Sequence, residues 1–331
     1  MKILVTGCYG FIGYNFVKYL NQKYEKSIEI IGIDSLTNPF SNYNSKNEDS
    51  INFKQLDINN ISELDENTCN NIDTIVNFAA ESHVDTSIYK PKVFLESNIL
   101  GLAEVMKFAI DNEIPNFVHV STDEVYGSYK NDFAVETSVL NPSSPYSASK
   151  ASAELIANSY EKTFDYEIKI VRPANNFGIY QQPEKLIPFS IANLINGNNI
   201  EIYGDGKHIR HWLHVNDTCS AIDTIIEKGD IGNTYNIGSG VYLNNIQVAK
   251  NVLSALDLNE DRMTFVKDRP GHDFRYAVNF EKLSKLGWKP NQEFELLLDK
   301  IVKWYVDNQE WWQEGFNQIL ENRNKRFSLD E

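Results

Sequence analysis

Short apolar runs rich in β-branched residues alternate with longer stretches of helical periodicity over the first half of the chain. This alternation is typical of parallel strands joined by crossover helices. The predicted strands cover residues 3–6, 28–34, 51–56, 74–78, 117–121 and 168–172, and the predicted helices lie near 11–22, 60–69, 92–112 and 147–163. Six strands connected in this way predict an α/β fold of the Rossmann type, with a doubly wound parallel sheet.

The regular alternation weakens after Pro173, where prolines and polar turns become frequent. One helix near 217–227 and one strand near 234–237 keep the earlier rhythm, so we expect them to rejoin the first sheet. The chain is therefore expected to form two discontinuous domains. The larger comprises 1–173 and about 212–238, and the smaller, a mixed α/β domain, comprises about 174–211 and 239–331.

Charge and cysteine content exclude several classes of protein. The chain has 31 Lys and Arg against 46 Asp and Glu, a net charge of −15, so a polyanion such as nucleic acid or an anionic membrane would be repelled. Its three cysteines, Cys8, Cys69 and Cys219, lie far apart and support neither a disulfide framework nor a metal site. The N-terminal apolar run of about four residues is too short for a signal-peptide core, and no later stretch approaches the roughly 18 apolar residues of a membrane span. We expect a cytoplasmic protein.

A glycine-rich loop follows the first strand and opens into a helix. Gly7, Gly10 and Gly13 form a GxxGxxG pattern that would let a pyrophosphate approach the backbone at the helix N-terminus. The spacing alone also fits an ordinary strand-to-helix turn. Asp34, however, ends the second predicted strand, where its carboxylate can accept hydrogen bonds from both ribose hydroxyls and would repel a 2′-phosphate. The combination favours NAD over NADP as the cofactor.

Tyr146 and Lys150 form a YxxxK pair, which places both side chains on one face of a helix. Four other pairs match the same spacing: Tyr14/Lys18, Tyr19/Lys23, Tyr126/Lys130 and Tyr203/Lys207. Only Tyr146 follows a helix start placed to reach the end of a central strand. A phenol acts as a base near neutral pH only if its anion is favoured by about 4 kcal/mol, or about three pKa units. A nearby ammonium and the positive nicotinamide ring together would provide this.

Two adjacent carboxylates lie where the strand at 117–121 ends, at the edge of the sheet where ligands bind in such folds. Thr122, Asp123 and Glu124 could therefore supply an acid and a base to neighbouring atoms of a substrate. The alternative is a solvated strand-to-loop turn.

Longer motifs carry a resemblance that covers essentially the full length. They are GxxGFIG at 7–13, NFAAESHVD at 77–85, STDEVYG at 121–127, SSPYSASK at 143–150, NN at 175–176, PEKLIP at 183–188, YGDG at 203–206, YNIG at 235–238 and DRPGHD at 268–273. With these motifs the chain resembles the extended short-chain dehydrogenase/reductase family, most closely its dTDP-glucose 4,6-dehydratases. The resemblance implies an NAD-dependent lyase that acts on a nucleotide-sugar as a homodimer, formed through the helices near 92–112 and 147–163.

The resemblance also implies roles for individual residues. The implied catalytic residues are Thr122, Asp123, Glu124, Tyr146 and Lys150. The implied cofactor-binding residues are Gly7, Gly10, Phe11, Ile12, Gly13, Asp34, Asp57, Ile58, Ala79, Ala80, Asn98, Tyr146, Lys150 and Asn176. The implied substrate-binding residues are Ser82, Thr122, Asn175, Lys185, Leu186, Tyr203, Arg210, Asn245, Arg269 and His272. No metal is implied.

Several activities remain compatible with these motifs. The expected reaction converts dTDP-glucose to the 4-keto-6-deoxy sugar with NAD regenerated in each cycle, and UDP-glucose or another nucleotide-hexose is an alternative substrate. A related 4-epimerase would be expected to lack the Asp-Glu pair, and a UDP-glucuronate decarboxylase would resemble Ser-Glu there, so Asp123 discriminates among them. A non-catalytic NAD-binding protein on the same fold is the alternative from another class.

The chain departs from the family pattern at four places. Cys8 and Tyr9 replace small residues, which predicts a large ring in the phosphate loop. Thr86 replaces an Arg, and His211 replaces an Asp. The sequence Arg-Pro-Ala at 172–174 replaces a Cys-Ser type of sequence. These departures leave the nucleotide and sugar preference open.

Overall fold

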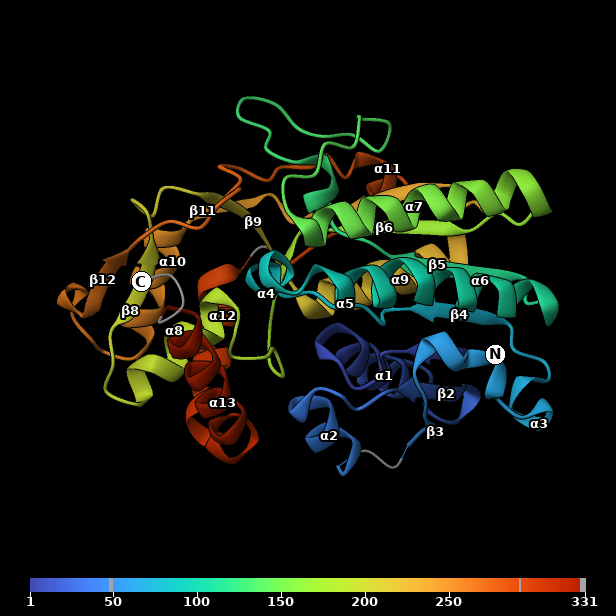
Figure 1. Ribbon diagram of the computed structural model, residues 1–331, viewed down its shortest axis with the longest axis horizontal. Coiled ribbons are helices and arrows are strands. Elements are labelled where there is room, and N and C mark those ends of the chain that lie inside the picture. Colours follow the sequence, from blue (N-terminus) through green and yellow to red (C-terminus); the bar gives the residue numbers. More distant parts are fainter. Residues whose placement is uncertain (48–49, 292, 328–331) are drawn as a thin grey trace.

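The computed structural model describes residues 1–47, 50–291 and 293–327. Its larger part is a parallel sheet between helices, and its smaller part, beside the carboxyl ends of the sheet strands, holds α8, α10, α12 and α13 (Figure 1). Within the described residues, no helix combines the length and the apolar character needed to cross a membrane.

The central sheet has seven strands in the order β10-β6-β5-β4-β1-β2-β3, and every neighbouring pair is parallel. The strands are β1 (Lys2–Thr6), β2 (Glu29–Asp34), β3 (Asn52–Gln55), β4 (Thr74–Asn77), β5 (Asn116–Val120), β6 (Lys169–Pro173) and β10 (Thr234–Ile237). The Rossmann-type prediction is confirmed. The expectation that the strand near 234–237 rejoins the sheet is also confirmed, because β10 pairs with β6.

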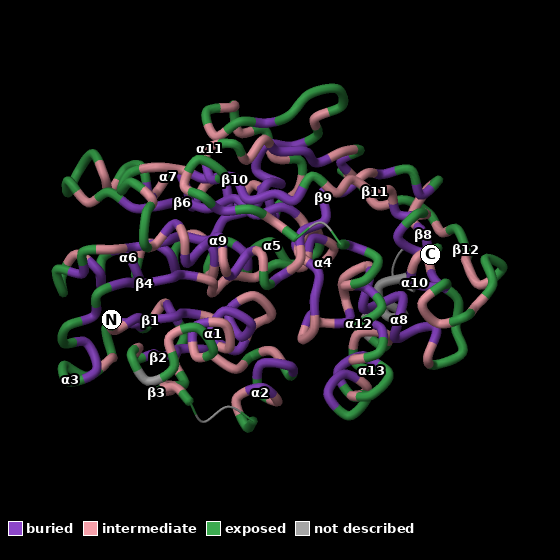
Figure 2. Tube along the Cα trace, turned by 180° about the vertical axis from the view of Figure 1, so that it is seen from behind, coloured by how far each residue is buried: buried purple, intermediate pink, exposed green. Residues whose placement is uncertain are grey.

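Apolar side chains on both faces of the strands explain the two helix layers. Ile3 and Val5 point into a core that α1 (Phe11–Tyr24) and α9 (Val215–Lys228) cover. Leu4 points into the opposite core, covered by α6 (Gly101–Asp111) and α7 (Pro145–Phe164). Figure 2 shows the inner strands of the sheet largely buried, whereas the edge strand β3 is exposed to half-buried. Burial on both faces is what continuous apolar strand runs predict.

Two predicted helices are divided in the structure. The helix expected near 60–69 is a 3₁₀ turn, η2 (Ile58–Glu63), followed by the short helix α3 (Glu66–Cys69). Asp57 and Asp65 each cap a helix N-terminus, accepting hydrogen bonds from Asn59 N and Thr68 N. The second capping residue, Asp65, therefore begins a separate helix. The helix expected near 92–112 comprises α5 (Pro91–Leu95), a wide π turn, η3 (Glu96–Leu100), and α6.

The smaller part contains two small sheets and the C-terminal helices. Its strands are β7 (Asn175–Phe177), β8 (Ile200–Tyr203), β9 (Ile209–His214), β11 (Val241–Asn244) and β12 (Met263–Val266), in the orders β11-β9-β7 and β12-β8. Its helices are α8 (Leu186–Ile195), α10 (Asn245–Ala255), α12 (Phe294–Asp307) and α13 (Gln309–Phe327). They enclose a separate apolar core that includes Trp312.

Short elements complete the chain: α2 (Pro39–Ser45), α4 (Val84–Tyr89), α11 (Glu281–Ser284) and the 3₁₀ turns η1 (Glu25–Ser27), η4 (Asp123–Tyr126) and η5 (Glu260–Arg262). The helix α2 joins the two parts. Trp311 on α13 packs on Phe40, with ring centroids 5.1 Å apart, and donates a hydrogen bond to Asn44 Oδ1 at 2.8 Å. The C-terminal helix is thereby anchored beside the glycine-rich loop region.

Candidate active site

The glycine-rich loop lies between β1 and α1 and has no room for side chains at two of its glycines. Gly7 has a positive φ of 61°, and a Cβ there would lie 2.8 Å from Ala79 N. A Cβ on Gly13 would lie 2.2 Å from Gly7 O. The bare backbone at the start of α1 is the arrangement that admits a pyrophosphate.

Asp34 ends β2 beside this loop. Its carboxylate accepts hydrogen bonds from Tyr9 N at 3.1 Å and from Leu36 N at 2.9 Å. Burial raises the pKa of Asp34, and the backbone donors Leu36, Tyr9 and Gly10 oppose that rise. The carboxylate therefore both supports the loop and faces the cavity described next.

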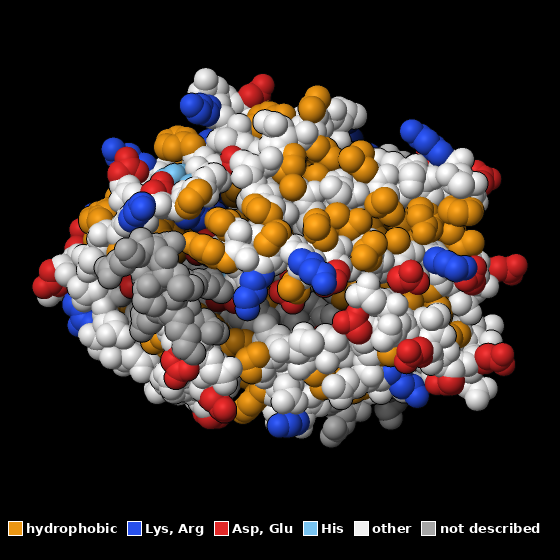
Figure 3. Space-filling model, in the orientation of Figure 1, with side chains coloured by type: hydrophobic (Ala, Val, Ile, Leu, Met, Phe, Trp, Pro, Cys, Tyr) orange, Lys and Arg blue, Asp and Glu red, His pale blue; other side chains and the backbone are white. Residues whose placement is uncertain are grey.

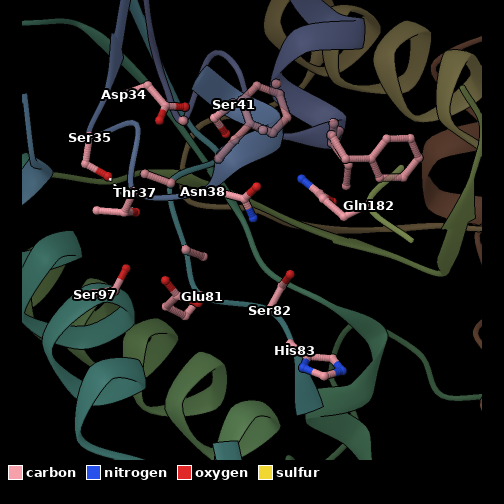
Figure 4. A pocket seen from close by; sticks show the side chains of 18 of the residues that line it. Asp34, Ser35, Thr37, Asn38, Ser41, Glu81, Ser82, His83, Ser97 and Gln182 are labelled. Carbon is pink, nitrogen blue, oxygen red and sulfur yellow. Dashed lines mark hydrogen bonds between the residues drawn. The ribbon is translucent and has the colours of Figure 1, made fainter. Parts of the chain in front are cut away.

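A cavity of about 320 Å³ runs from the loop along the carboxyl ends of β1, β4 and β5 (Figure 4). In Figure 4, Asp34, Ser35, Thr37 and Asn38 lie on one side and Glu81, Ser82, His83 and Ser97 lie on the opposite side. Predicted site residues that line it are Gly7, Gly10, Phe11, Ile12, Gly13, Asp34, Asp57, Ile58, Ala79, Ala80, Ser82, Tyr146, Lys150 and Lys185. The cavity carries polar side chains on both of these sides, as the ribose and phosphate groups of a dinucleotide require.

Several lining residues were not predicted from the sequence. They include Ser35, Thr37, Asn38, Ser41, Ser97, Gln182 and Glu184. Asn38 caps α2 through a hydrogen bond from Phe40 N, and the Asn-Pro pair at 38–39 is a helix-start signal. That signal locates the helix but not its place beside the cavity, because the place depends on how β2 pairs with β1.

Two predicted cofactor residues point elsewhere. Asn98 is buried and holds the backbone of Glu81 through hydrogen bonds to both its N–H and its carbonyl, at 2.8 and 3.0 Å. Asn176 accepts a hydrogen bond from Thr218 and donates one to Ala174 O. Neither residue lines the cavity. Their side-chain bonds to the protein indicate support of the cavity wall.

The large ring predicted in the phosphate loop, that of Tyr9, does not face the cavity. The Tyr9 ring is buried and packs edge-on against Phe53, with centroids 4.8 Å apart, and against Tyr14. Cys8 is fully buried in the same core. Both side chains point away from the cavity because the loop directs its glycines and backbone toward it.

Thr122, Asp123 and Glu124 form the turn after β5 and are all buried. Thr122 caps this turn, η4, accepting a hydrogen bond from Glu124 N at 3.3 Å. Both carboxylate oxygens of Asp123 are buried without a hydrogen-bond partner among the described residues. Burial, and then the charge of Glu124, raise the pKa of Asp123 well above its usual value. This turn is therefore not the solvated loop that was the alternative, and it favours a protonated Asp123.

The helix α7 begins with a strong N-terminal signal that fixes Tyr146 and Lys150. Ser144 and Ser147 form a reciprocal capping box, and Pro145 occupies the first turn. Burial raises the pKa of Tyr146, the negative charge of Glu124 raises it further, and a hydrogen bond with Thr122 opposes the rise. The protein alone therefore favours the phenol, and the positive nicotinamide ring would favour its anion.

Buried polar atoms also collect on the side of the smaller part. Asn175 Oδ1, Arg210 Nη2 and Arg269 Nε are buried without a hydrogen-bond partner among the described residues. The Arg210 guanidinium stacks 4.4 Å from the centroid of the Tyr276 ring, and Tyr276 Oη donates to Glu124 at 3.4 Å. Native proteins leave few buried polar groups unpaired, so these atoms indicate a ligand site.

Ser82, just before α4, and Asp85, within it, contact predicted substrate-binding residues of the smaller part. Asp85 accepts hydrogen bonds from Tyr203 Oη and from Arg269 Nη1, both at 3.1 Å. Lys185 Nζ donates to Ser82 O at 2.6 Å. The structure therefore brings these predicted residues together across the two parts of the molecule.

His272 lies in a second polar cluster with His208 and Asp268. The two imidazole rings stack 3.7 Å apart, and His272 Nδ1 lies 2.6 Å from Asp268 Oδ1. The ligand atoms of the three residues are close enough together to hold a cation. Burial, and then the charges of Arg269 and Arg210, lower the pKa of His272 to about 3.

The departures at Arg172 and His211 have structural roles. Arg172 forms a buried ion pair with Glu154 on α7 and donates to Tyr126 Oη. His211 is fully buried, and its Nε2 accepts hydrogen bonds from Ser239 N at 2.9 Å and Gly240 N at 2.8 Å. Burial lowers the pKa of His211 to about 3, so the imidazole is neutral and accepts hydrogen bonds from these two backbone groups. The remaining predicted residues, Leu186 and Asn245, begin α8 and α10.

Comparisons with known proteins agree with this geometry. Residues 4–301 match the family model described as GDP-mannose 4,6 dehydratase. The chain is 42% identical to the low-salt glycan biosynthesis protein Agl12 of Haloferax volcanii, over 94% of this chain and 100% of that protein. It is 38% identical to a dTDP-glucose 4,6-dehydratase of Streptomyces antibioticus, over 95% of each chain.

A solved structure agrees as well. The dTDP-glucose 4,6-dehydratase DesIV of Streptomyces venezuelae, solved with NAD and TYD bound, superposes with a TM-score of 0.90. The two chains are 39% identical, and the match covers 95% of this chain and 100% of DesIV. This chain therefore belongs to the nucleotide-sugar 4,6-dehydratases of the extended short-chain dehydrogenase/reductase family, as its motifs predict.

Proposed function

We propose that this protein is an NAD-dependent hydro-lyase that converts dTDP-glucose to the 4-keto-6-deoxy sugar. The observation that carries the proposal is the buried Asp123, which has no hydrogen-bond partner among the described residues and lies next to Glu124 at the end of β5. An epimerase needs no group that gives a proton to a departing C6 hydroxyl, whereas a dehydratase does. The relatives named dTDP-glucose 4,6-dehydratase support this substrate.

NAD fits the residues present. The loop around Gly7 and Gly13 leaves no space for a Cβ, and Asp34 faces the cavity at the end of β2. Gly7, Gly10, Gly13, Asp34 and Lys150 would hold the dinucleotide. When bound, NAD would take up a hydride from C4 of the sugar and return it to C6. The DesIV structure, which contains NAD, supports this assignment.

The side chains divide the proton transfers among themselves. Tyr146 takes the proton of the C4 hydroxyl, which is required for that carbon to become a ketone. The ketone acidifies the neighbouring C5, and Glu124 takes the C5 proton. Asp123, whose pKa is raised by burial and by the charge of Glu124, gives its proton to the C6 hydroxyl as it leaves as water. At the end Glu124 returns a proton to C5, Tyr146 releases the C4 hydroxyl proton to solvent and Asp123 takes one up, so the net change in the sugar is the loss of one water.

The two parts of the chain are assigned different tasks. Residues 1–173 with about 212–238 would bind NAD, and about 174–211 with 239–331 would bind the nucleotide-sugar. Arg210, Arg269 and Lys185 supply cations for the diphosphate, and Tyr203 supplies an aromatic face for the base. The unpaired buried atoms of Arg210 and Arg269 support this assignment. The three buried, free cysteines fit a reducing cytoplasm.

A homodimer completes the proposal. Exposed apolar side chains gather over α4, α5, α6 and α7 on the face shown in Figure 3. They include Tyr89, Val93, Leu95, Leu100, Leu155 and Phe164. An exposed apolar patch of this kind fits a second copy of the chain, and part of it lies on α7, the helix that carries Tyr146. Leu155→Glu should therefore convert the dimer to a monomer in analytical ultracentrifugation.

The function is tested by incubating the purified protein separately with dTDP-glucose and UDP-glucose. The 4-keto product is detected by its absorbance in alkali, and faster turnover of dTDP-glucose is expected. Deuterium placed at C4 should appear at C6 of the product, without reduced NAD accumulating in the medium. Stoichiometric release of reduced NAD would instead identify a simple dehydrogenase.

A further inference from the structure

A row of buried polar side chains crosses three strands of the central sheet and ends at Lys150, which lines the cavity. Thr6 is the register partner of Asn77, and Asn77 is the register partner of His119, on the neighbouring strands β1, β4 and β5. Register partners on parallel strands present their side chains to the same face of the sheet. The row continues to α7, because His119 Nε2 lies 3.4 Å from Lys150 Nζ.

The hydrogen bonds along the row have a direction. The backbone N–H of Ala79 donates to Thr6 Oγ1 at 3.1 Å, and Thr6 Oγ1 donates to Asn77 Oδ1 at 2.6 Å. The amide nitrogen of Asn77 then faces His119 Nδ1 at 3.2 Å and donates to it. With Nδ1 as the acceptor, the neutral imidazole carries its proton on Nε2, which faces Lys150.

All four side chains are buried. Burial, together with the charge of Lys150, lowers the pKa of His119 well below its usual value, so the ring is neutral. Lys150 Nζ already donates to Val120 O at 2.7 Å. If Lys150 is protonated, the Nε2–H of His119 points at an ammonium that has no lone pair to accept a hydrogen bond. If Lys150 is neutral, its amine nitrogen can accept a hydrogen bond from this Nε2–H.

We propose that His119 is a positioning residue for Lys150. Its Nε2–H, oriented by Thr6 and Asn77, holds the lysine nitrogen against Val120 and favours release of the lysine proton. The proposal rests on the proposed function for the use of Tyr146 as a base, and on the expectation from the YxxxK pair that the Lys150 ammonium stabilises the Tyr146 anion.

Few other charged groups act on Lys150. Burial lowers the pKa of Lys150 to about 8, and Glu154, one turn further along α7, opposes this lowering. Glu154 is itself fixed by Arg172 from β6 and by Ser121 from the end of β5. Tyr146, one turn earlier on α7, also lines the cavity with Lys150. A substitution at His119 leaves all of these groups in place.

Two variants of His119 distinguish the effect of its hydrogen bonds from the effect of the volume of the ring. His119→Gln keeps an acceptor for Asn77 and a donor for Lys150, and His119→Leu removes both. The loss of activity at high pH reports the deprotonation of Lys150, because the ammonium stabilises the Tyr146 anion. In His119→Leu this alkaline limb of the kcat/KM profile should move up by roughly half to one pH unit, and His119→Gln should keep the original profile. Equal profiles for the Leu variant and the unaltered protein, or equal shifts in both variants, would overturn the proposal.

A second measurement does not depend on turnover. In protein labelled with ¹⁵N-histidine, the ring nitrogens of His119 should show the Nε2–H tautomer and should remain neutral when the pH falls below the usual histidine pKa of about 6.5. A proton on Nδ1, or a charged ring at neutral pH, would contradict the proposal. An inactive protein with the expected tautomer would contradict the proposed function instead.

Discussion

Arg269 reaches from the smaller part of the molecule to Asp85 on α4, where their side chains form an ion pair at 3.1 Å. Asp85 also accepts a hydrogen bond from Tyr203, so one carboxylate orients two proposed substrate residues. The charge of Arg269 is the main cause that lowers the pKa of Asp85, against the effect of burial. The pair fixes the guanidinium before any substrate arrives, which lowers the entropy lost on binding.

Asp85→Ala should therefore weaken binding of thymidine diphosphate by on the order of tenfold, because Arg269 and Tyr203 lose their common partner. Calorimetry with the NAD-loaded protein measures this. Asp111→Ala, which removes an exposed acid on α6, is the matched control and should leave the affinity unchanged. Tighter binding in Asp85→Ala would show that the carboxylate competes with the diphosphate instead of orienting its ligands.

Asp123 and Tyr146 are expected to act in different steps. Asp123→Asn keeps the shape and a donor but has no transferable proton, so oxidation at C4 should continue while product formation falls by a factor on the order of 10² or more. Single-turnover absorbance should then show reduced NAD accumulating on the enzyme. Tyr146→Phe should slow the appearance of that absorbance itself. A variant Asp123→Asn that is slow in the first oxidation and normal in loss of water would transfer the acid role to Thr122.

Asp34 is expected to decide between NAD and NADP. The unaltered protein should bind NAD far more tightly than NADP, because the buried carboxylate would repel a 2′-phosphate. Asp34→Asn keeps only one of the two oxygens that accept from Tyr9 N and Leu36 N, and it removes the charge, so the preference should fall by about tenfold or more. Asp57→Asn, at another acid that lines the cavity, should change the affinities for both cofactors alike. Similar dissociation constants for NAD and NADP in the unaltered protein would disprove the prediction.

The buried histidines are expected to make the fold sensitive to acid. Burial lowers the pKa of His211 to about 3 and that of His214 to about 4, whereas an unfolded histidine titrates near 6.5. The unfolded chain therefore binds more protons below about pH 6.5. Each such histidine should lower the free energy of unfolding by up to about 1.4 kcal/mol per pH unit as the pH falls from there toward the folded pKa.

Chemical denaturation between pH 4 and pH 8 measures this slope. His211→Gln offers an amide oxygen near the position of Nε2 to Ser239 N and Gly240 N and does not titrate, so its slope below pH 6.5 should be shallower. Above about pH 7.5 the two proteins should differ by a constant amount, since histidine is neutral in both states there. Identical slopes in acid would show that His211 contributes nothing to the pH dependence.

The sequence alone predicted the sheet and the chemical groups of the site. Strand runs such as Ile3 to Thr6 are apolar on both faces, which only a sheet covered on both sides can accommodate. The loop glycines, Asp34 and the turn at 122–124 could be assigned because each follows directly from its position at the end of a strand. The start of α7 was also predictable, since its capping residues are local in the sequence.

Only the tertiary structure decided which side chains meet. Asp85 contacts Arg269, 184 residues further along, and the row from Thr6 to Lys150 exists because β1, β4 and β5 are neighbours in one register. The Tyr9 ring turned away from the cavity for the same kind of reason, since Phe53 on β3 offered it an apolar surface. Periodicity and capping act over a few residues, whereas these contacts depend on which strands pair and on the space left between them, and no local pattern encodes either.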